Sequence, residues 1–264
     1  MAAEAAFDGA LAALVLAAGV GSRLRPLTRM RPKALCPVAN RPLVDLAVDR
    51  VAAVVGAGAV AVNVHAGRDA RVRAGRDAVE AHLDGRVHLS FEEPEVLGTA
   101  GAVGHLRPWL DGRAVLVVNA DAWHTADLAP LVADWDGERV RVLMAGPPEL
   151  SATSLVIGSL LPAATAAALA AVPSGLYEVC WSPAAAAGRL EVTAVDIPFI
   201  DCGRPVDYLA ANLAASGGAS VVGEGAVVAG TLVRSVVWPG GVVHRGEHLV
   251  DAIRVDSRMT VLVR

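Results

Sequence analysis

A glycine-rich stretch near the start of the chain carries residue types that suit phosphate binding. The pattern Gly19-x-Gly-Ser-Arg23 follows an apolar run, and Lys33 lies ten residues further on. A glycine-rich turn after a first strand brings several backbone N–H groups to one phosphate. A dinucleotide fingerprint is excluded because Leu24 stands where it needs a third glycine, and the Gly-Lys-Ser/Thr of a Walker loop is absent. A surface turn with ordinary basic residues is the alternative interpretation.

Lys33 is set apart by composition. Lysine and arginine together number 23, and Lys33 is the only lysine among them. A chain that uses arginine for nearly every cation has kept one compact ammonium, which a planar guanidinium does not replace in shape. This favours a specific role for Lys33, although chance alone can also leave a single lysine.

The elements that would position these residues alternate between apolar strands and helical patterns. Strands are predicted at 10–18, 59–64, 87–91 and 114–118, and helices at 42–55, 68–83, 99–106 and 207–215. This alternation predicts an α/β protein with a doubly wound, mostly parallel, Rossmann-like sheet. Ligands bind beyond the carboxyl ends of the strands in such a sheet. Gly19, Gly98, Asn119 and Asp121 all fall at those ends.

The last part of the chain has a different period. Branched aliphatic residues recur every six positions with glycines between them, at Val237, Val243, Leu249, Val255 and Val261, and upstream at Val222 and Val228. This period predicts a few coils of a parallel β-helix, with an irregular β tail as the alternative. We therefore expect a first domain over 1–215 and a short left-handed, hexapeptide-type β-helix-like segment over 219–264.

Bulk properties exclude several classes of protein. A net charge of −4 gives no reason to expect a nucleic-acid partner, and three scattered cysteines are too few for a disulfide framework or zinc site. The uncharged stretch 150–177 contains prolines and glycines and lacks basic flanks, so we interpret it as a buried strand and a helix and expect no membrane partner. The stretch 1–10 has no basic residue, unlike a signal peptide, and a cytoplasmic location is expected.

Four segments, in order, resemble the sugar-1-phosphate nucleotidyltransferase (nucleotide-sugar pyrophosphorylase) family. They are the Gly19–Lys33 signature, a base-binding loop at 93–101, a metal-binding strand end at 117–121, and a second metal motif with its following helix at 199–212. The chain is most similar to the mannose-1-phosphate guanylyltransferase and N-acetylmuramate-1-phosphate uridylyltransferase members. The resemblance makes residues 1–215 a nucleotidyltransferase domain.

The resemblance also implies roles for individual residues. Arg23 would hold the β- and γ-phosphates of a nucleoside triphosphate, and Lys33 would stabilise charge at the α-phosphate. Asp121 and Asp201 would bind Mg²⁺ through hard oxygen ligands, with Asp121 also catalytic. Their alternative interpretation is a cap and a turn residue. The implied substrate-binding residues are Ala17, Gly19, Gly21, Ser22, Glu93, Gly98, Thr99, Asn119, Gly158 and Arg204.

Two departures from the family pattern concern the sugar phosphate. Arg204 stands where members usually have threonine in Gly-Thr-Pro, and a single lysine leaves none for the Glu-Lys-Pro hairpin. Our hypothesis is that Arg204 replaces part of that cation; the rival is a solvated Arg204 beside a degraded sugar site. Gly158 would mark the backbone beside the sugar ring, with a strand–helix junction as its alternative.

The expected activity is transfer of a nucleotidyl group to a sugar 1-phosphate, with release of pyrophosphate. Mannose-1-phosphate guanylyl transfer is one specific form of it. The alternative is a nucleotide-binding regulator or pseudoenzyme of the same fold that lacks transfer activity. A homodimer is one option for its assembly, and the identities of base and sugar stay open.

Overall fold

The computed structural model describes residues 10–67 and 69–263, and the chain divides into two compact units. The first unit contains the chain up to Gly19 and residues 47–120 and 125–198. The second contains residues 20–46 and 121–124 and the chain from Phe199 onward. The prediction that the stretch 1–10 is not a signal peptide falls almost entirely outside the described part, as does the first residue of the helix predicted at 68–83.

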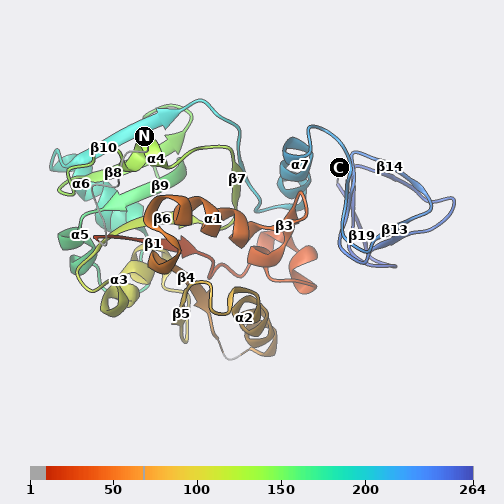
Figure 1. Cartoon of the computed structure of the whole chain (residues 1–264), viewed down its shortest axis with the longest axis horizontal. Helices are drawn as coiled ribbons and strands as arrows, with labels where there is room; N and C mark the ends of the chain where they lie inside the picture. Colours follow the sequence, from red (N-terminus) through yellow and green to blue (C-terminus); the bar gives the residue numbers. More distant parts are fainter. Residues whose placement is uncertain (1–9, 68, 264) are drawn as a thin grey trace. The chain divides into compact units, whose positions relative to one another are not determined.

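A seven-stranded sheet forms the centre of the first unit, in the order β10-β8-β9-β6-β1-β4-β5 (Figure 1). Its strands are β1 (Leu11–Leu16), β4 (Val60–His65), β5 (His88–Glu92), β6 (Ala114–Asn119), β8 (Val140–Ala145), β9 (Leu155–Leu161) and β10 (Leu190–Val195). Only β9 runs antiparallel to its neighbours, β6 and β8. The mostly parallel α/β sheet predicted from the alternation of strands and helices is confirmed.

Helices connect these strands. They are α1 (Leu43–Val55, which crosses from the second unit into the first), α2 (Ala70–Leu83), α3 (Gly98–Leu110), α4 (Ala129–Val132), α5 (Ala163–Ala168) and α6 (Ser182–Ala186), with a π-helix at Tyr177–Trp181 and a 3₁₀ turn at Ala57–Ala59. Of these, α1, α2, α3 and α5 lie close to positions that the sequence pattern predicts, whereas α4, α6 and the π-helix were not predicted. The apolar stretch 150–177 forms β9 and α5, as interpreted. Within the described residues, no helix is long and apolar enough to cross a membrane.

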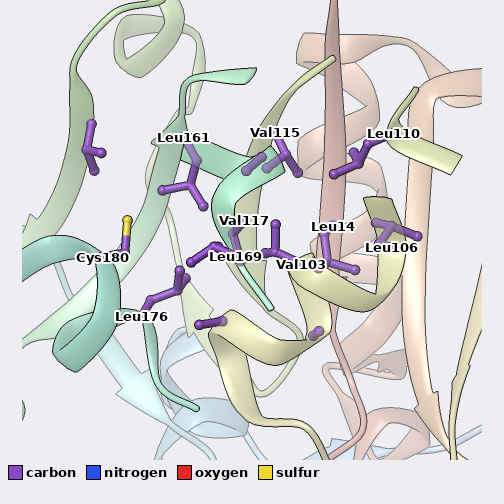
Figure 2. Close-up of a cluster of buried hydrophobic side chains, with 14 of the residues drawn as sticks. Leu14, Val103, Leu106, Leu110, Val115, Val117, Leu161, Leu169, Leu176 and Cys180 are labelled. Atoms are coloured by element: carbon purple, nitrogen blue, oxygen red, sulfur yellow. The ribbon is translucent and has the colours of Figure 1, made fainter. Parts of the chain in front are cut away.

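The core of the first unit lies where α3 packs on the sheet. Figure 2 shows Val103, Leu106 and Leu110 of α3 against Leu14 of β1 and Val115 of β6, all of them buried. Leu14 and Val115 come from the two strands whose ends carry predicted ligand positions. Burying aliphatic side chains at this density stabilises the unit by roughly 1.5–3 kcal/mol for each large residue.

The register of the sheet sets the height of the polar residues at its carboxyl edge. Leu16 of β1 is the register partner of Asn63 on β4 and of Asn119 on β6. On the neighbouring pair, His65 of β4 is opposite Glu92 of β5. Two asparagines therefore flank the last residue of β1, just before the glycine-rich turn begins.

The second unit is built from short elements. They are the 3₁₀ turns Ser22–Leu24, Leu27–Arg29 and Lys33–Leu35, the hairpin of β2 (Pro37–Val38) and β3 (Arg41–Pro42), the antiparallel pair of β7 (Ala122–His124) and β11 (Phe199–Asp201), and α7 (Pro205–Ala215). Strands β12 to β19 follow. The helix predicted at 207–215 corresponds to α7.

A buried pair of aromatic residues joins these short elements. The Tyr208 hydroxyl donates to the Pro37 carbonyl and accepts from the Trp238 indole N–H at 2.9 Å. Asn212, one turn along α7, accepts from the Ala39 N–H at 3.0 Å and donates to the Tyr208 carbonyl. These hydrogen bonds give the buried polar groups of Tyr208, Trp238 and Asn212 partners, as buried polar groups require. They join α7, the β2–β3 hairpin and the segment around Trp238, which share one hydrophobic core.

The tail forms parallel strands stacked on three faces, which Figure 1 shows as a triangle. Its strands are β12 (Val221–Val222), β13 (Val227–Val228), β14 (Thr231–Val233), β15 (Val236–Val237), β16 (Val242–Val243), β17 (His248–Val250), β18 (Ala252–Arg254) and β19 (Thr260–Leu262). Val237, Val243 and Leu249 fill the interior. The six-residue period therefore predicts the β-helix-like tail correctly.

The period does not continue to the end of the chain. Val261 lies in β19, which pairs antiparallel with β18 and so ends the stack. The coils are also shorter than three sets of six residues: Val221 pairs with Val236, and Val236 with Ile253. Val255 belongs to the core around Tyr208 and not to the interior of the coils.

Two glycines of the first unit, Gly101 on α3 and Gly58 in the turn Ala57–Ala59, differ in how closely other atoms approach them. A methyl group on Gly101 would lie well inside van der Waals contact of the Val172 carbonyl, whereas one on Gly58 would meet nothing within 4 Å. We expect Gly101→Ala to lower the free energy of unfolding by about 1–3 kcal/mol, because overpacking outweighs the gain in helix propensity. Urea denaturation should find Gly58→Ala within about 0.5 kcal/mol of the wild type. Equal stability of both variants would contradict this packing.

Candidate active site

Lys33 is the most buried charged residue of the candidate site. It opens the 3₁₀ turn Lys33–Leu35, and its side chain is only 8% exposed. Its ammonium group donates to Asp121 Oδ2 at 2.6 Å and lies 3.5 Å from Asp201 Oδ1. A buried ammonium needs such partners, because without them its loss of hydration costs several kcal/mol.

The two aspartates meet because their strands are paired. Asp121 directly precedes β7 and Asp201 ends β11, and these strands run antiparallel with Asp201 opposite Ala122. The Cys202 N–H donates to the Asp121 carbonyl at 2.9 Å, which extends the pairing by one more bond. Both carboxylates are partly exposed, so one face of the pair stays open to solvent.

Two further residues lie beside Asp201. Arg23, in the first 3₁₀ turn, has Nη2 3.6 Å from Asp201 Oδ2 and is 70% exposed. An ion pair this exposed contributes little to stability, so the guanidinium can move to another anion at small cost. A methyl group on Gly203 would lie 3.1 Å from Asp201 Oδ1 and 3.2 Å from Arg23 Nη2, so glycine leaves the space that this carboxylate occupies.

Gly21 shapes the turn that carries Lys33. Its backbone is left-handed, with φ of 62°, and its carbonyl accepts from the Thr28 hydroxyl at 2.9 Å. A Cβ at this position would lie 2.8 Å from Thr28 Cγ2 and 3.0 Å from Lys33 Cβ. Both the conformation and the close approach to the lysine stem require glycine here.

The chemistry of the donor set suits a magnesium ion. Asp121 and Asp201 already share one cation, the Lys33 ammonium, and both present hard carboxylate oxygens. Mg²⁺ is bound in proteins through one or two carboxylates, with waters and substrate phosphates completing the shell. No cluster of three or more His, Cys, Asp or Glu side chains suited to a metal occurs in the described part of the chain.

The two cysteines near the Lys33–Asp121–Asp201 cluster, Cys36 and Cys202, are poor nucleophiles. Burial raises the pKa of Cys36 to about 12 and that of Cys202 to about 12, although the Lys33 ammonium opposes both shifts. Burial likewise raises the pKa of Cys180, in the first unit, to about 11. The thiolate is the reactive form, so covalent catalysis through cysteine is disfavoured.

The remaining predicted site residues lie in the glycine-rich turn or just at or after the ends of strands. Ser22 begins the first 3₁₀ turn, and Gly19 has open space where a side chain would lie. Asn119 ends β6 and is partly buried, and Glu93 is exposed after β5. Of the predicted site residues, Arg23, Lys33, Asp121 and Asp201 are joined to one another by ion pairs, all within the second unit.

Other predicted residues belong to the first unit and have structural partners there. The Ala17 N–H donates to Asn63 Oδ1 at 2.6 Å, and the Thr99 hydroxyl accepts from the Leu176 N–H at 2.7 Å. A Cβ on Gly98 would lie 2.6 Å from the Ser174 carbonyl oxygen, and the backbone φ of Gly98 is 71°.

Gly158 and Arg204 differ in part from the expectations for them. Gly158 lies inside β9, and a Cβ there would face leucine side chains, so its alternative interpretation as a strand–helix junction is wrong. Arg204 precedes α7 and holds both carboxylate oxygens of Asp207, at 2.7 and 3.1 Å. It is 63% exposed, and contact with a sugar phosphate stays a prediction.

Three residues next to the predicted site residues were not predicted from the sequence. Gly203 is identified only by the space it leaves beside Asp201. Asn63 and Glu92 are buried polar residues on β4 and β5 and hydrogen-bond to each other at 2.8 Å. The available signal was an amide within an otherwise apolar strand, Val60–Val64.

Comparison with known proteins identifies the family. The family model described as nucleotidyl transferase matches residues 12–153, more than half of the chain, and includes Lys33 and Asp121. The chain belongs to the nucleotidyl transferase family. This confirms the resemblance inferred from the four segments.

Two curated relatives and one solved structure illustrate the similarity. An N-acetylmuramate alpha-1-phosphate uridylyltransferase of Caulobacter vibrioides is 40% identical over 144 residues, 50% of this chain and 56% of that protein. A mannose-1-phosphate guanylyltransferase of Mycobacterium tuberculosis is 32% identical over 120 residues, 46% of this chain and 32% of that protein. The matches thus span about half or less of these relatives.

The solved structure supports the fold over nearly the whole chain. A Thermus thermophilus protein described as a mannose-1-phosphate geranyltransferase superposes with a TM-score of 0.68 and 22% identity, covering 96% of this chain and 95% of that one. The likeness includes the tail as well as the sheet.

The raised pKa values of the thiols predict slow alkylation. At pH 8 a thiol with a pKa of about 12 is almost entirely protonated, so we expect iodoacetamide to label Cys36 and Cys202 at least about 100-fold more slowly in folded protein than in urea. Peptide mass spectrometry over time measures each site. Rapid labelling of either residue in folded protein would contradict the burial described above.

Proposed function

We propose that this protein transfers a nucleotidyl group from a nucleoside triphosphate to a sugar 1-phosphate, forming a nucleotide sugar and pyrophosphate. The observation that carries the proposal is the Lys33 ammonium held between Asp121 and Asp201. These residues come from three separate segments that all resemble the family's motifs. Membership of the nucleotidyl transferase family supports the same activity.

The chain's own residues supply positioning and charge. Lys33 would stabilise the negative charge that builds on the α-phosphate as the sugar-phosphate oxygen attacks in line. Arg23, held only by an exposed ion pair, would turn to the β- and γ-phosphates and stabilise the leaving pyrophosphate. Members of the family generally use a divalent metal. We assign Mg²⁺ to Asp121 and Asp201, where it would neutralise phosphate charge when bound.

Two substrate pairs follow from the relatives. One matching protein is named for N-acetylmuramate 1-phosphate and uridylyl transfer, and another for mannose 1-phosphate and guanylyl transfer. We propose that the substrates of this protein come from these two pairs. Discrimination between them depends on a few hydrogen bonds to base and sugar.

A regulator that binds nucleotide without transfer is the competing function. It is favoured by two observations: the chain has no second lysine, and Arg204 is engaged by Asp207. A regulator would bind nucleoside triphosphate and release no pyrophosphate. The two functions therefore separate in one assay.

The first test is pyrophosphate release from a matrix of nucleoside triphosphates and sugar 1-phosphates with Mg²⁺. We expect release only when both substrates are present, and strongest with one of the two pairs above. Asp121→Asn should lower kcat by about 100-fold or more, since it removes a charged ligand that acts on the developing charge. Asp207→Asn, which removes a carboxylate in the first turn of α7 that does not contact Lys33, is the matched control and should retain most of kcat. Nucleotide binding with no release from any pair would favour the regulator.

The role of Arg204 is tested by its replacement with the residue usual in the family. If Arg204 leaves Asp207 to bind the sugar phosphate, Arg204→Thr should raise KM for the sugar 1-phosphate by roughly tenfold, as expected for a lost charge-assisted hydrogen bond. KM for the nucleoside triphosphate should stay within about twofold. An unchanged KM for the sugar phosphate would leave Arg204 with a structural role beside Asp207 only.

A further inference from the structure

Asn63 and Glu92 form a buried polar pair inside the first unit. Asn63 is 2% exposed and Glu92 is fully buried. Asn63 Nδ2 donates to Glu92 Oε1 at 2.8 Å. A buried carboxylate and a buried amide cost free energy unless nearly all of their hydrogen bonds are made. The oxygens that the two side chains do not use for each other, Asn63 Oδ1 and Glu92 Oε2, therefore need partners of their own.

Both outer ends bind backbone N–H groups of loops. Asn63 Oδ1 accepts from the Ala17 N–H at 2.6 Å and from the Ala18 N–H at 3.3 Å, where the glycine-rich turn leaves β1. Glu92 Oε2 accepts from the Leu97 N–H at 2.8 Å. Leu97 immediately precedes Gly98 and caps α3. The pair thus connects two loops that are eighty residues apart in the chain.

The direction of every hydrogen bond in this series is determined by the backbone. Peptide N–H groups only donate, so the oxygen of Asn63 must face Ala17 and its amide nitrogen must face Glu92. Glu92 then receives one donor on each oxygen, from Asn63 and from Leu97. Only an amide at position 63 combined with a carboxylate at position 92, or the reverse, satisfies all of these donors.

The Leu97 end also determines the path of the chain at Gly98. The Leu97 carbonyl accepts from the Ser174 N–H at 3.0 Å, and the Ser174 carbonyl accepts from the Ala100 N–H at 3.0 Å. Gly98 is packed between these bonds, with Ser174 too close for any side chain. A shift of Leu97 therefore moves the whole first turn of α3.

We propose that Asn63 and Glu92 are positioning residues that hold the backbone at Ala17 and Ala18, just after β1, and the loop before α3 in one fixed arrangement for the nucleotide. This inference rests on the proposed function, together with the base-binding role that the family resemblance implies for the loop 93–101. Neither side chain is available to contact the nucleotide, because all their described polar contacts are internal. Their effect on binding is carried by the backbone of Ala17, Ala18 and Leu97.

The order of donors and acceptors provides a test by isosteric exchange. Glu92→Gln places two donors face to face, because the new amide has one oxygen for the N–H groups of Asn63 and Leu97. Asn63→Asp places two carboxylate oxygens face to face. The double variant Asn63→Asp/Glu92→Gln restores a donor for every acceptor, keeps the net charge of −1 on the pair and changes no shape.

The first measurement is amide hydrogen exchange at Ala17, Ala18 and Leu97 in protein without substrate. Each single variant should raise exchange by about tenfold or more in both loops, including the loop that its own side chain does not touch. The double variant should return both loops close to wild-type exchange. Asn212→Asp, which changes a buried asparagine of the second unit, should destabilise the protein and leave both loops unchanged.

The second measurement is nucleoside triphosphate binding by calorimetry, together with KM and kcat where turnover is found. Each single variant should weaken nucleotide binding by about tenfold and raise KM for the nucleotide more than it lowers kcat, and the double variant should recover both. Exchange that rises in only the near loop, or a double variant as weak as the singles, would overturn the inference. A wild-type protein that releases no pyrophosphate from any substrate pair would instead refute the proposed function, while the exchange pattern still decides whether the pair connects the loops.

Discussion

The arrangement of the second unit depends on the need to satisfy one buried ammonium group. Lys33 is almost fully buried, and its charge is stabilised only because Asp121 and Asp201 both face it. This requirement joins three distant segments: the turn of Lys33, the start of β7 and the end of β11. Gly21 and Gly203 leave room on either side, one for the lysine stem and one for the Asp201 carboxylate.

The tail contributes to the same arrangement. Trp238, directly after β15, donates to the Tyr208 hydroxyl, which in turn donates to the Pro37 carbonyl just after the Lys33 turn. The Arg31 guanidinium lies 5.1 Å from the centre of the Trp238 ring. Burial raises the pKa of Tyr208 well above its usual value, which favours the protonated hydroxyl that donates to the Pro37 carbonyl. Through Trp238 the coils thus contact the segment that carries Lys33.

Local patterns in the sequence were sufficient for the first strands of the sheet, the longer helices and the acidic strand ends, but not for β8, β10 and the shorter helices. Apolar runs and helical spacing depend on nearest neighbours, and the ends of parallel strands share one edge of a sheet. The bond between Asn63 and Glu92 was not predictable, because it depends on the register of β4 with β5 and on loops at both ends. The antiparallel β19 was missed for a related reason: Val261 keeps the six-residue spacing, but its pairing is decided by the turn after β18.

The geometry also explains why the only lysine stands at position 33. Arg204 and Arg234 each grip both oxygens of a single carboxylate, that of Asp207 and that of Asp251 respectively. A planar fork suits that task. The Lys33 ammonium instead contacts one oxygen from each of two carboxylates, Asp121 just before β7 and Asp201 at the end of β11, which converge on a single charge. A guanidinium at this position would either pair with only one of the two carboxylates or need more space between β7 and β11. A chain that uses arginine everywhere else therefore keeps lysine where two acidic groups must share a single cation.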